Sequence, residues 1–188
     1  MPSSPAAVRR AGFDDLPAVR ETRLRALADT PSAFASTLAR EQALTDDDWR
    51  RRLGNGIWLL AWDGDEPVGI VSAFAEPGRP AERHLVSMWV APSHRGLGVA
   101  DHLVEAVVRW AREERAEALV LWVADGNDRA RAFYDRVGFS PTGRRQPLPS
   151  DPDVGESQLS RPLSSGIRPD LVGRNESRST REDDDGDR

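Results

Sequence analysis

The chain has 188 residues, a net charge of −5 and no cysteine, and all 26 of its basic side chains are arginines. Its length and its hydrophobic fraction of 38% allow one domain with a modest core, and its charge gives no reason to expect nucleic acid or a membrane as a partner. The lack of cysteine excludes disulfides, thiolate zinc sites and a cysteine nucleophile. Neither a secretory signal nor a membrane-spanning run is recognisable, so we expect a cytoplasmic protein.

The N-terminal part of the chain predicts one short strand and two helices. The strand covers residues 8–11. One of the aspartates at 14–15 can cap a helix whose apolar residues recur at helical spacing, and Pro31 stops that helix. A second helical stretch covers about 39–53, with a break or cap near Thr45.

The middle of the chain changes to a β pattern. Two apolar runs within 57–75 are joined by Asp63-Gly64-Asp65, which indicates a hairpin. A third strand-like run spans 83–92 and is followed by a glycine turn and a helix to about Glu113. Three strands in succession predict a meander before that helix.

The C-terminal part alternates strand and helix before it turns polar. We expect a fully apolar strand at 118–124, a short helix ended by Gly138, a Pro-rich loop over 142–153 and a last strand at 157–163. From 164 to 188 the composition collapses to Ser, Gly, Arg and Asp, which cannot bury enough apolar area to offset its ordering entropy. We therefore expect one domain over 1–163 and a disordered acidic and polar tail over 164–188.

Gly96 and Gly98 stand between the strand that ends at Pro92 and the following helix. The start of a helix leaves backbone N–H groups unpaired at the positive end of its dipole, and glycine lets an anion approach them. This turn is suited to phosphate or pyrophosphate, although a tight strand–helix connection alone would also explain the glycines. A P-loop is excluded because there is no lysine, and Asp101 breaks a dinucleotide fingerprint.

The turn and a second motif carry a resemblance to a known family. The segment from Arg95 to Ala100 is similar to the R/Q-x-x-G-x-G/A signature of the GNAT superfamily of N-acetyltransferases. Downstream, "NDRARAFYDRVGF" resembles that family's N-x-x-A-x-x-x-Y-x-x-x-G-F segment, with Asn127 and Tyr134 in the matching positions. The resemblance follows the element order over most of the chain and is strong from Val86 to Phe139.

This resemblance implies an α/β (α+β) fold. The expected sheet is central, mixed and mostly antiparallel, with six to seven strands, a splayed parallel strand pair and about four flanking helices. In the family, acetyl-CoA lies between the two splayed strands, which here are 85–90 and 118–123. The cofactor-binding residues carried over are Met88, Trp89, Val90, Arg95, Gly96, Leu97, Gly98, Val99, Ala100 and Asn127.

The same resemblance implies the chemistry, which needs an oxyanion donor, an acid and a base. Tyr134, the only tyrosine, is the family's usual proton donor to the leaving thiolate, and ordinary aromatic packing is its alternative role. The general base is left open. Neither splayed strand carries a carboxylate, so the candidates are His84, Glu76 and Asp125 at strand ends, acting through water.

Signals for the acceptor are sparse. Phe34 and Trp122 are candidates for its apolar wall, and Arg144 is a candidate for binding an acidic group. We expect acetyl transfer to a primary amine of a small molecule or peptide by direct attack, with no metal, and a homodimer is compatible with the family. Two alternatives stay open: an acetyl-CoA-binding sensor with little catalysis, and a nucleotide-binding α/β protein.

Overall fold

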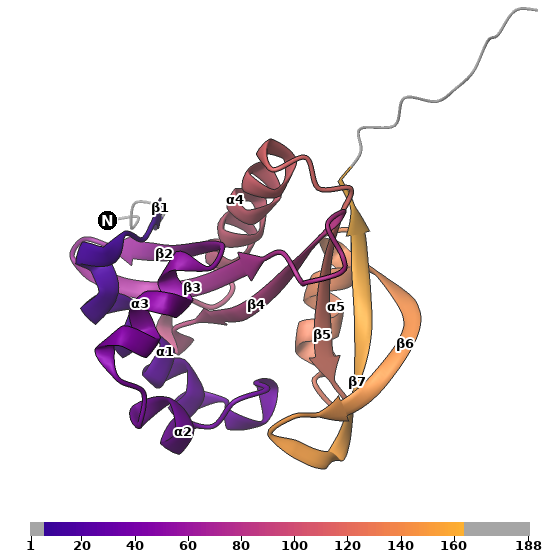
Figure 1. The fold of residues 1–188 in the computed structure, drawn as a ribbon, viewed down its shortest axis with the longest axis horizontal. Coiled ribbons are helices and arrows are strands. Elements are labelled where there is room, and N and C mark those ends of the chain that lie inside the picture. The colour runs from indigo at the N-terminus through magenta and orange to yellow at the C-terminus, as the bar shows by residue number, and fades with distance from the viewer. Residues whose placement is uncertain (1–5, 164–188) are drawn as a thin grey trace, which may run out of the picture.

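A computed structural model describes residues 6–163, so the predicted tail over 164–188 lies outside the described residues. The described chain forms one seven-stranded sheet in the order β1-β2-β3-β4-β5-β7-β6 (Figure 1). Neighbouring strands are antiparallel except for β4 and β5, which are parallel, so the predicted mixed and mostly antiparallel sheet is confirmed. The strands are β1 Ala7–Arg10, β2 Ile57–Asp63, β3 Glu66–Phe74, β4 Glu82–Val90, β5 Ala118–Ala124, β6 Ser140–Leu148 and β7 Asp151–Pro162.

Within residues 6–163, five α-helices flank the sheet, close to the number expected from the sequence. They are α1 Leu16–Asp29, α2 Leu38–Gln42, α3 Asp46–Gly54, α4 Val99–Glu113 and α5 Asp128–Arg136. Helix α4 packs against the central strands with a wide buried stripe that includes Leu103, Val107 and Ala111, each 0% exposed. Gly69 of β3 faces this helix, and an added Cβ would lie 3.1 Å from Leu103 Cδ1. The small residue thus allows helix and sheet to approach closely.

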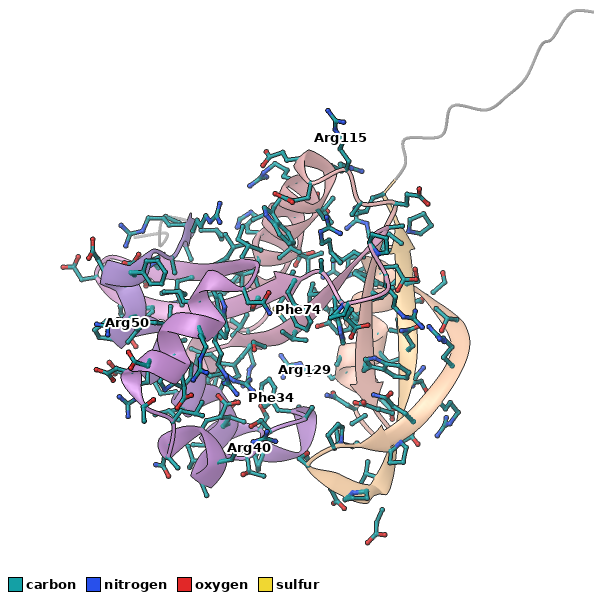
Figure 2. All side chains as sticks on the ribbon, in the orientation of Figure 1. Phe34, Arg40, Arg50, Phe74, Arg115 and Arg129 are labelled. Carbon is teal, nitrogen blue, oxygen red and sulfur yellow. The ribbon has the colours of Figure 1, made fainter. Side chains whose placement is uncertain are left out.

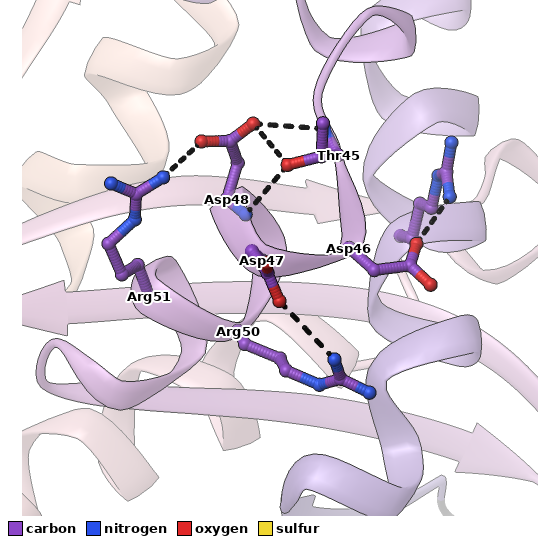
Figure 3. A network of polar contacts seen from close by, with 7 residues as sticks. Thr45, Asp46, Asp47, Asp48, Arg50 and Arg51 are labelled. Atoms are coloured by element: carbon purple, nitrogen blue, oxygen red, sulfur yellow. Dashed lines mark hydrogen bonds and ion pairs between the residues drawn. The ribbon is translucent and has the colours of Figure 1, made fainter.

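The second predicted helical stretch is divided at Thr45, as the sequence suggested. Thr45 Oγ1 accepts a 3.2 Å hydrogen bond from the N–H of Asp48, and the Asp48 carboxylate accepts one of 2.9 Å from the N–H of Thr45 (Figure 3). This reciprocal capping box starts α3, and acidic residues in its first turn match the positive end of the helix dipole. Helices α2 and α3 both pack against α1.

The loop predicted over 142–153 is wrong. Most of that segment is paired as β6 and the beginning of β7, with Arg145 opposite Ser157 and a turn near Ser150. Every residue from Ser140 to Pro147 is exposed, so the strand has no alternation of apolar and polar residues. Two prolines also fit an edge strand, where a missing N–H does no harm. Residues 140–148 thus form a strand because they pair with β7, although their local sequence pattern does not indicate one.

Strands β4 and β5 separate along their length, as the predicted splayed pair requires. Their pairing ends at His84 opposite Val120, while both strands continue beyond that point. A bulge in β4 adds to the divergence, because Val86 pairs with Ser72 and Trp89 with Ile70. Ser87 in this bulge has a φ of 60°, in the left-handed region that few non-glycine residues adopt. Figure 1 shows the two strands diverging, with α5 behind β5.

Candidate functional site

A cavity of about 850 Å³ lies where β4 and β5 separate. Its lining comes from both strands, from the glycine turn before α4, from α5 and from the segment around Phe34. Figure 2 shows Phe34, Phe74 and Arg129 around the space between the two halves of the sheet. The volume is in the range of small-molecule sites. Segments far apart in the sequence thus meet at one concave site.

The glycine turn has the geometry of an anion-binding helix start. Gly96 and Gly98 have φ values of 79° and 80°, and an added Cβ at either position would meet nothing within 4 Å. The first hydrogen bond of α4 runs from the N–H of His102 to the carbonyl of Gly98, over 3.1 Å. The N–H groups that precede it in the first turn have no partner within the helix. The open space and these donors suit a phosphate group.

Arg95 is bound mainly to the protein itself. Its Nε donates to the carbonyl of Val90 over 2.9 Å, and its guanidinium also binds the Asp29 carboxylate at the end of α1. The indole nitrogen of Trp89 donates to the same carboxylate over 2.9 Å. Burial alone would raise the pKa of Asp29, but these hydrogen bonds and the charge of Arg95 hold that pKa below its ordinary value. Arg95 therefore fixes the turn against α1.

Most of the residues predicted from the sequence line the cavity. Those that do are Phe34, Met88, Trp89, Val90, Arg95, Gly96, Gly98, Val99, Ala100, Trp122, Asn127 and Tyr134.

Two predicted residues are not part of this lining, Leu97 and Arg144. Leu97 is 64% exposed, and it lies between two glycines whose left-handed backbone makes the turn. Arg144 belongs to the exposed face of the edge strand β6. Its neighbour Arg145 is occupied by an ion pair with Asp125. The anion-binding role suggested for Arg144 therefore has no support from its position.

Tyr134 reaches the cavity from α5 and is held in place by aromatic packing. Its ring meets those of Phe133 and Phe139 edge to face, with centroids 5.2 and 5.4 Å away. The side chain is only 6% exposed, and burial raises the pKa of its hydroxyl far above the ordinary value. A phenol in this environment stays protonated and can act as a proton donor.

Asn127 starts α5 as its N-cap. Its Oδ1 accepts a 3.2 Å hydrogen bond from the N–H of Ala130, a role that the sequence motif alone did not reveal. The side-chain oxygen is therefore used by the helix. The NH₂ group is the part of this amide that can serve a ligand in the cavity.

A carboxylate that sequence reasoning missed also lines the cavity. Glu156 is 4% exposed on β7, opposite Ala124 of β5, and accepts a 2.6 Å hydrogen bond from Nε2 of Gln146. Burial raises the pKa of Glu156 above its ordinary value, although the Gln146 hydrogen bond and the charge of His84 act the other way. The last strand predicted from the sequence covers 157–163 and so begins just after Glu156, and no local pattern indicates that Glu156 is buried.

Of the three bases considered from the sequence, only His84 is among the residues that line the cavity. Its Nδ1 lies 2.7 Å from Oε1 of Glu76, and its ring contacts Phe74 at a centroid distance of 5.4 Å. Asp125 lies at the exposed end of β5 in its ion pair with Arg145. Among residues 6–163, no three His, Cys, Asp or Glu side chains gather as metal ligands, and no helix is long and apolar enough to cross a membrane.

Comparison with known proteins identifies the family. The model of the acetyltransferase (GNAT) family matches residues 22–139, which is well over half of the chain. The chain belongs to the GNAT family. The match includes the glycine turn, both splayed strands and the whole of α5.

Relatives of this GNAT chain are about a third identical to it within an aligned segment of some 90 residues. N-acetyltransferase 8F1 of Rattus norvegicus is 32% identical over 94 residues, 48% of this chain and 42% of the rat protein. The peptidyl-lysine N-acetyltransferase YjaB of Salmonella typhimurium is 31% identical over 90 residues, 48% of this chain and 54% of YjaB. The matches therefore span about half the length of these relatives.

Solved structures share the GNAT fold over nearly their whole length. YncA of Salmonella typhimurium, solved with its cofactor acetyl-CoA, is 18% identical, has a TM-score of 0.70 and covers 89% of this chain and 99% of its own. A GNAT-family acetyltransferase of Streptococcus pneumoniae is 20% identical, has a TM-score of 0.69 and covers 83% and 98%. At this identity the likeness concerns the fold.

Proposed function

We propose that this chain is an N-acetyltransferase that moves the acetyl group of acetyl-CoA to a primary amine by direct attack in a ternary complex. One observation carries the proposal: a glycine turn suited to phosphate and a protonated phenol, Tyr134, line the same cavity of a GNAT-family chain. The acetyl-CoA in YncA, which has the same fold, supports this choice of donor.

The residues present fit acetyl-CoA. The diphosphate would bind the N–H groups from Gly96 to Ala100, where the missing Cβ atoms leave open space. Beyond His84, β4 has no hydrogen-bonded partner in β5, so main-chain groups near Met88 and Val90 would be left for the pantetheine arm. A thioester oxygen accepts hydrogen bonds, so N–H groups of β4 would be its donors, while the carbonyl of Val90 already accepts from Arg95.

Acetyl-CoA, when bound, supplies an acyl carbon activated by its thioester. Tyr134 would give its hydroxyl proton to the sulfur that leaves, because its phenol lines the cavity and is protonated at neutral pH. Glu156 would accept the proton of the incoming amine, directly or through water, because its raised pKa brings it nearer the operating pH than an ordinary carboxylate. Tyr134 on α5 would thus be the acid and Glu156 on β7 the base.

Glu156 also favours an enzyme over the sensor alternative. That alternative rested on the lack of a carboxylate in the splayed segments 85–90 and 118–123, and β7 supplies one to the same cavity. Catalysed thiol release with a panel of primary amines tests the proposal, and calorimetry with acetyl-CoA separates binding from turnover. Acetyl-CoA binding without thiol release for any amine would favour the sensor, and no binding heat would contradict the proposal.

A further inference from the structure

A group of three charged side chains, Arg23, Glu41 and Arg52, lines the cavity from the side of α1, α2 and α3. Arg23 donates from Nε and Nη2 to the two oxygens of Glu41 over 3.1 and 3.0 Å. Nη1 of Arg52 lies 3.2 Å from the same carboxylate. Arg23 and Glu41 are 5% and 1% exposed, whereas the Arg52 side chain is 34% exposed. We call these three residues the arginine pair site.

The arginine pair site has two guanidinium groups and one carboxylate, so its net charge is positive. Burial would raise the pKa of Glu41, but the hydrogen bonds of Arg23 and the charges of both arginines hold it below its ordinary value, so the carboxylate is ionised. One carboxylate therefore faces two guanidinium groups. In addition, Nη1 of Arg23 is buried and has no hydrogen-bond partner among the described residues. A buried donor and an excess charge are both unfavourable until an anion pairs with them.

The surroundings of this site are apolar and partly closed. The guanidinium of Arg23 stacks on the ring of Phe34 at 4.4 Å, and Trp58 and Phe74 line the same cavity. Ser150, in the turn between β6 and β7, donates a 2.6 Å hydrogen bond to the carbonyl of Phe34. This contact joins the β6–β7 turn to the segment around Phe34 at the edge of the cavity, and such a closed edge suits a small ligand better than a polypeptide segment.

We propose that the acetyl acceptor is a small amino acid, whose amine reacts and whose carboxylate binds at the arginine pair site. The inference rests on the proposed acetyl transfer and adds the class of acceptor. A carboxylate would pair with Arg52, the member of the site that is accessible, and would balance its excess charge. The apolar neighbours favour an amino acid with an apolar or aromatic side chain.

The first test compares acceptors that share a ring and a primary amine and differ in whether they carry a carboxylate. Phenylalanine, phenylalaninamide and phenethylamine present the same ring and amine with and without a carboxylate. We expect kcat/KM for phenylalanine to exceed that for the two uncharged analogues by roughly tenfold or more. In Arg52→Gln this preference should vanish through a higher KM for phenylalanine, while Glu41 keeps Arg23 as its partner. Arg51→Gln is the control, because Arg51 lies on α3 outside the cavity lining.

A second measurement separates this inference from the proposed function. N-acetylphenylalanine and N-acetylphenylalaninamide resemble the two products and bind without any transfer. Calorimetry should give a Kd roughly tenfold or more lower for the acid than for the amide in the native chain, and equal values in Arg52→Gln. Equal binding of the two compounds to the native chain, or binding of neither, overturns the inference, whether or not thiol release has been seen with other amines.

Discussion

Gln146 of β6 donates a 2.6 Å hydrogen bond to the buried carboxylate of Glu156 on β7. This contact fixes the carboxylate in the cavity while burial raises its pKa. A base works only when it is ionised, so activity should fall as the pH drops through this raised pKa, above the value of about 4.3 for a free glutamate. Glu156→Gln should lower kcat by about a hundredfold and remove that acidic limb, measured as a pH profile of kcat/KM.

Stability provides the control for the same variant. Because the folded pKa of Glu156 is raised, its charge opposes folding above that pKa, and this penalty disappears at lower pH. Glu156→Gln removes the charge and keeps an oxygen for Gln146, so the free energy of unfolding at neutral pH should stay level or rise in urea titrations. An unchanged acidic limb in a folded variant would exclude Glu156 as the base.

Tyr134→Phe is expected to lower kcat by about tenfold or more and to leave the Kd of acetyl-CoA nearly unchanged. The substitution keeps the ring that packs against Phe133 and Phe139 and removes only the hydroxyl. Stopped-flow thiol release and calorimetry measure the two quantities. Turnover equal to that of the native chain would leave Tyr134 with a packing role alone.

Gly98→Val should weaken acetyl-CoA binding by placing a branched side chain where the diphosphate would bind. Its φ of 80° also makes the valine backbone strained, so a matched control is needed. Gly78 has a φ of 81° and the same open surroundings, and it is not part of the cavity lining. Gly78→Val should therefore lose similar stability with an unchanged Kd. Equal Kd values for the two variants would contradict a diphosphate site at the turn.

Glu41→Gln should destabilise the fold by roughly 3–5 kcal/mol, because it leaves two guanidinium groups without a carboxylate. The folded pKa of Glu41 is lowered, so its contribution is present above the unfolded value of about 4.3 and is lost as the pH falls through the folded pKa. Urea unfolding from pH 7 to pH 3 measures this. Asp47→Asn, which breaks an exposed ion pair with Arg50, serves as the control with a change below about 1 kcal/mol.

The elements that local chemistry controls were predictable. The strand over 118–124 has the bounds expected from its apolar run. The break at Thr45 follows from a capping box between Thr45 and Asp48, which are only three positions apart. The glycine turn and α5 were recognised because their motifs are contiguous in the chain. In each case the residues that decide the structure are close neighbours, so the sequence displays the interaction directly.

The sequence alone showed the turn before α4 and the motifs of the family, because both depend on residues close together in the chain, and the resemblance implied the parallel strand pair. Only the tertiary structure decided that β6 is a strand, that Glu156 is a buried carboxylate and that Arg23 and Arg52 share Glu41. These features depend on pairing, burial and charge between segments far apart in the chain. Burial and nearby charge set a pKa, and both arise only when the chain has folded.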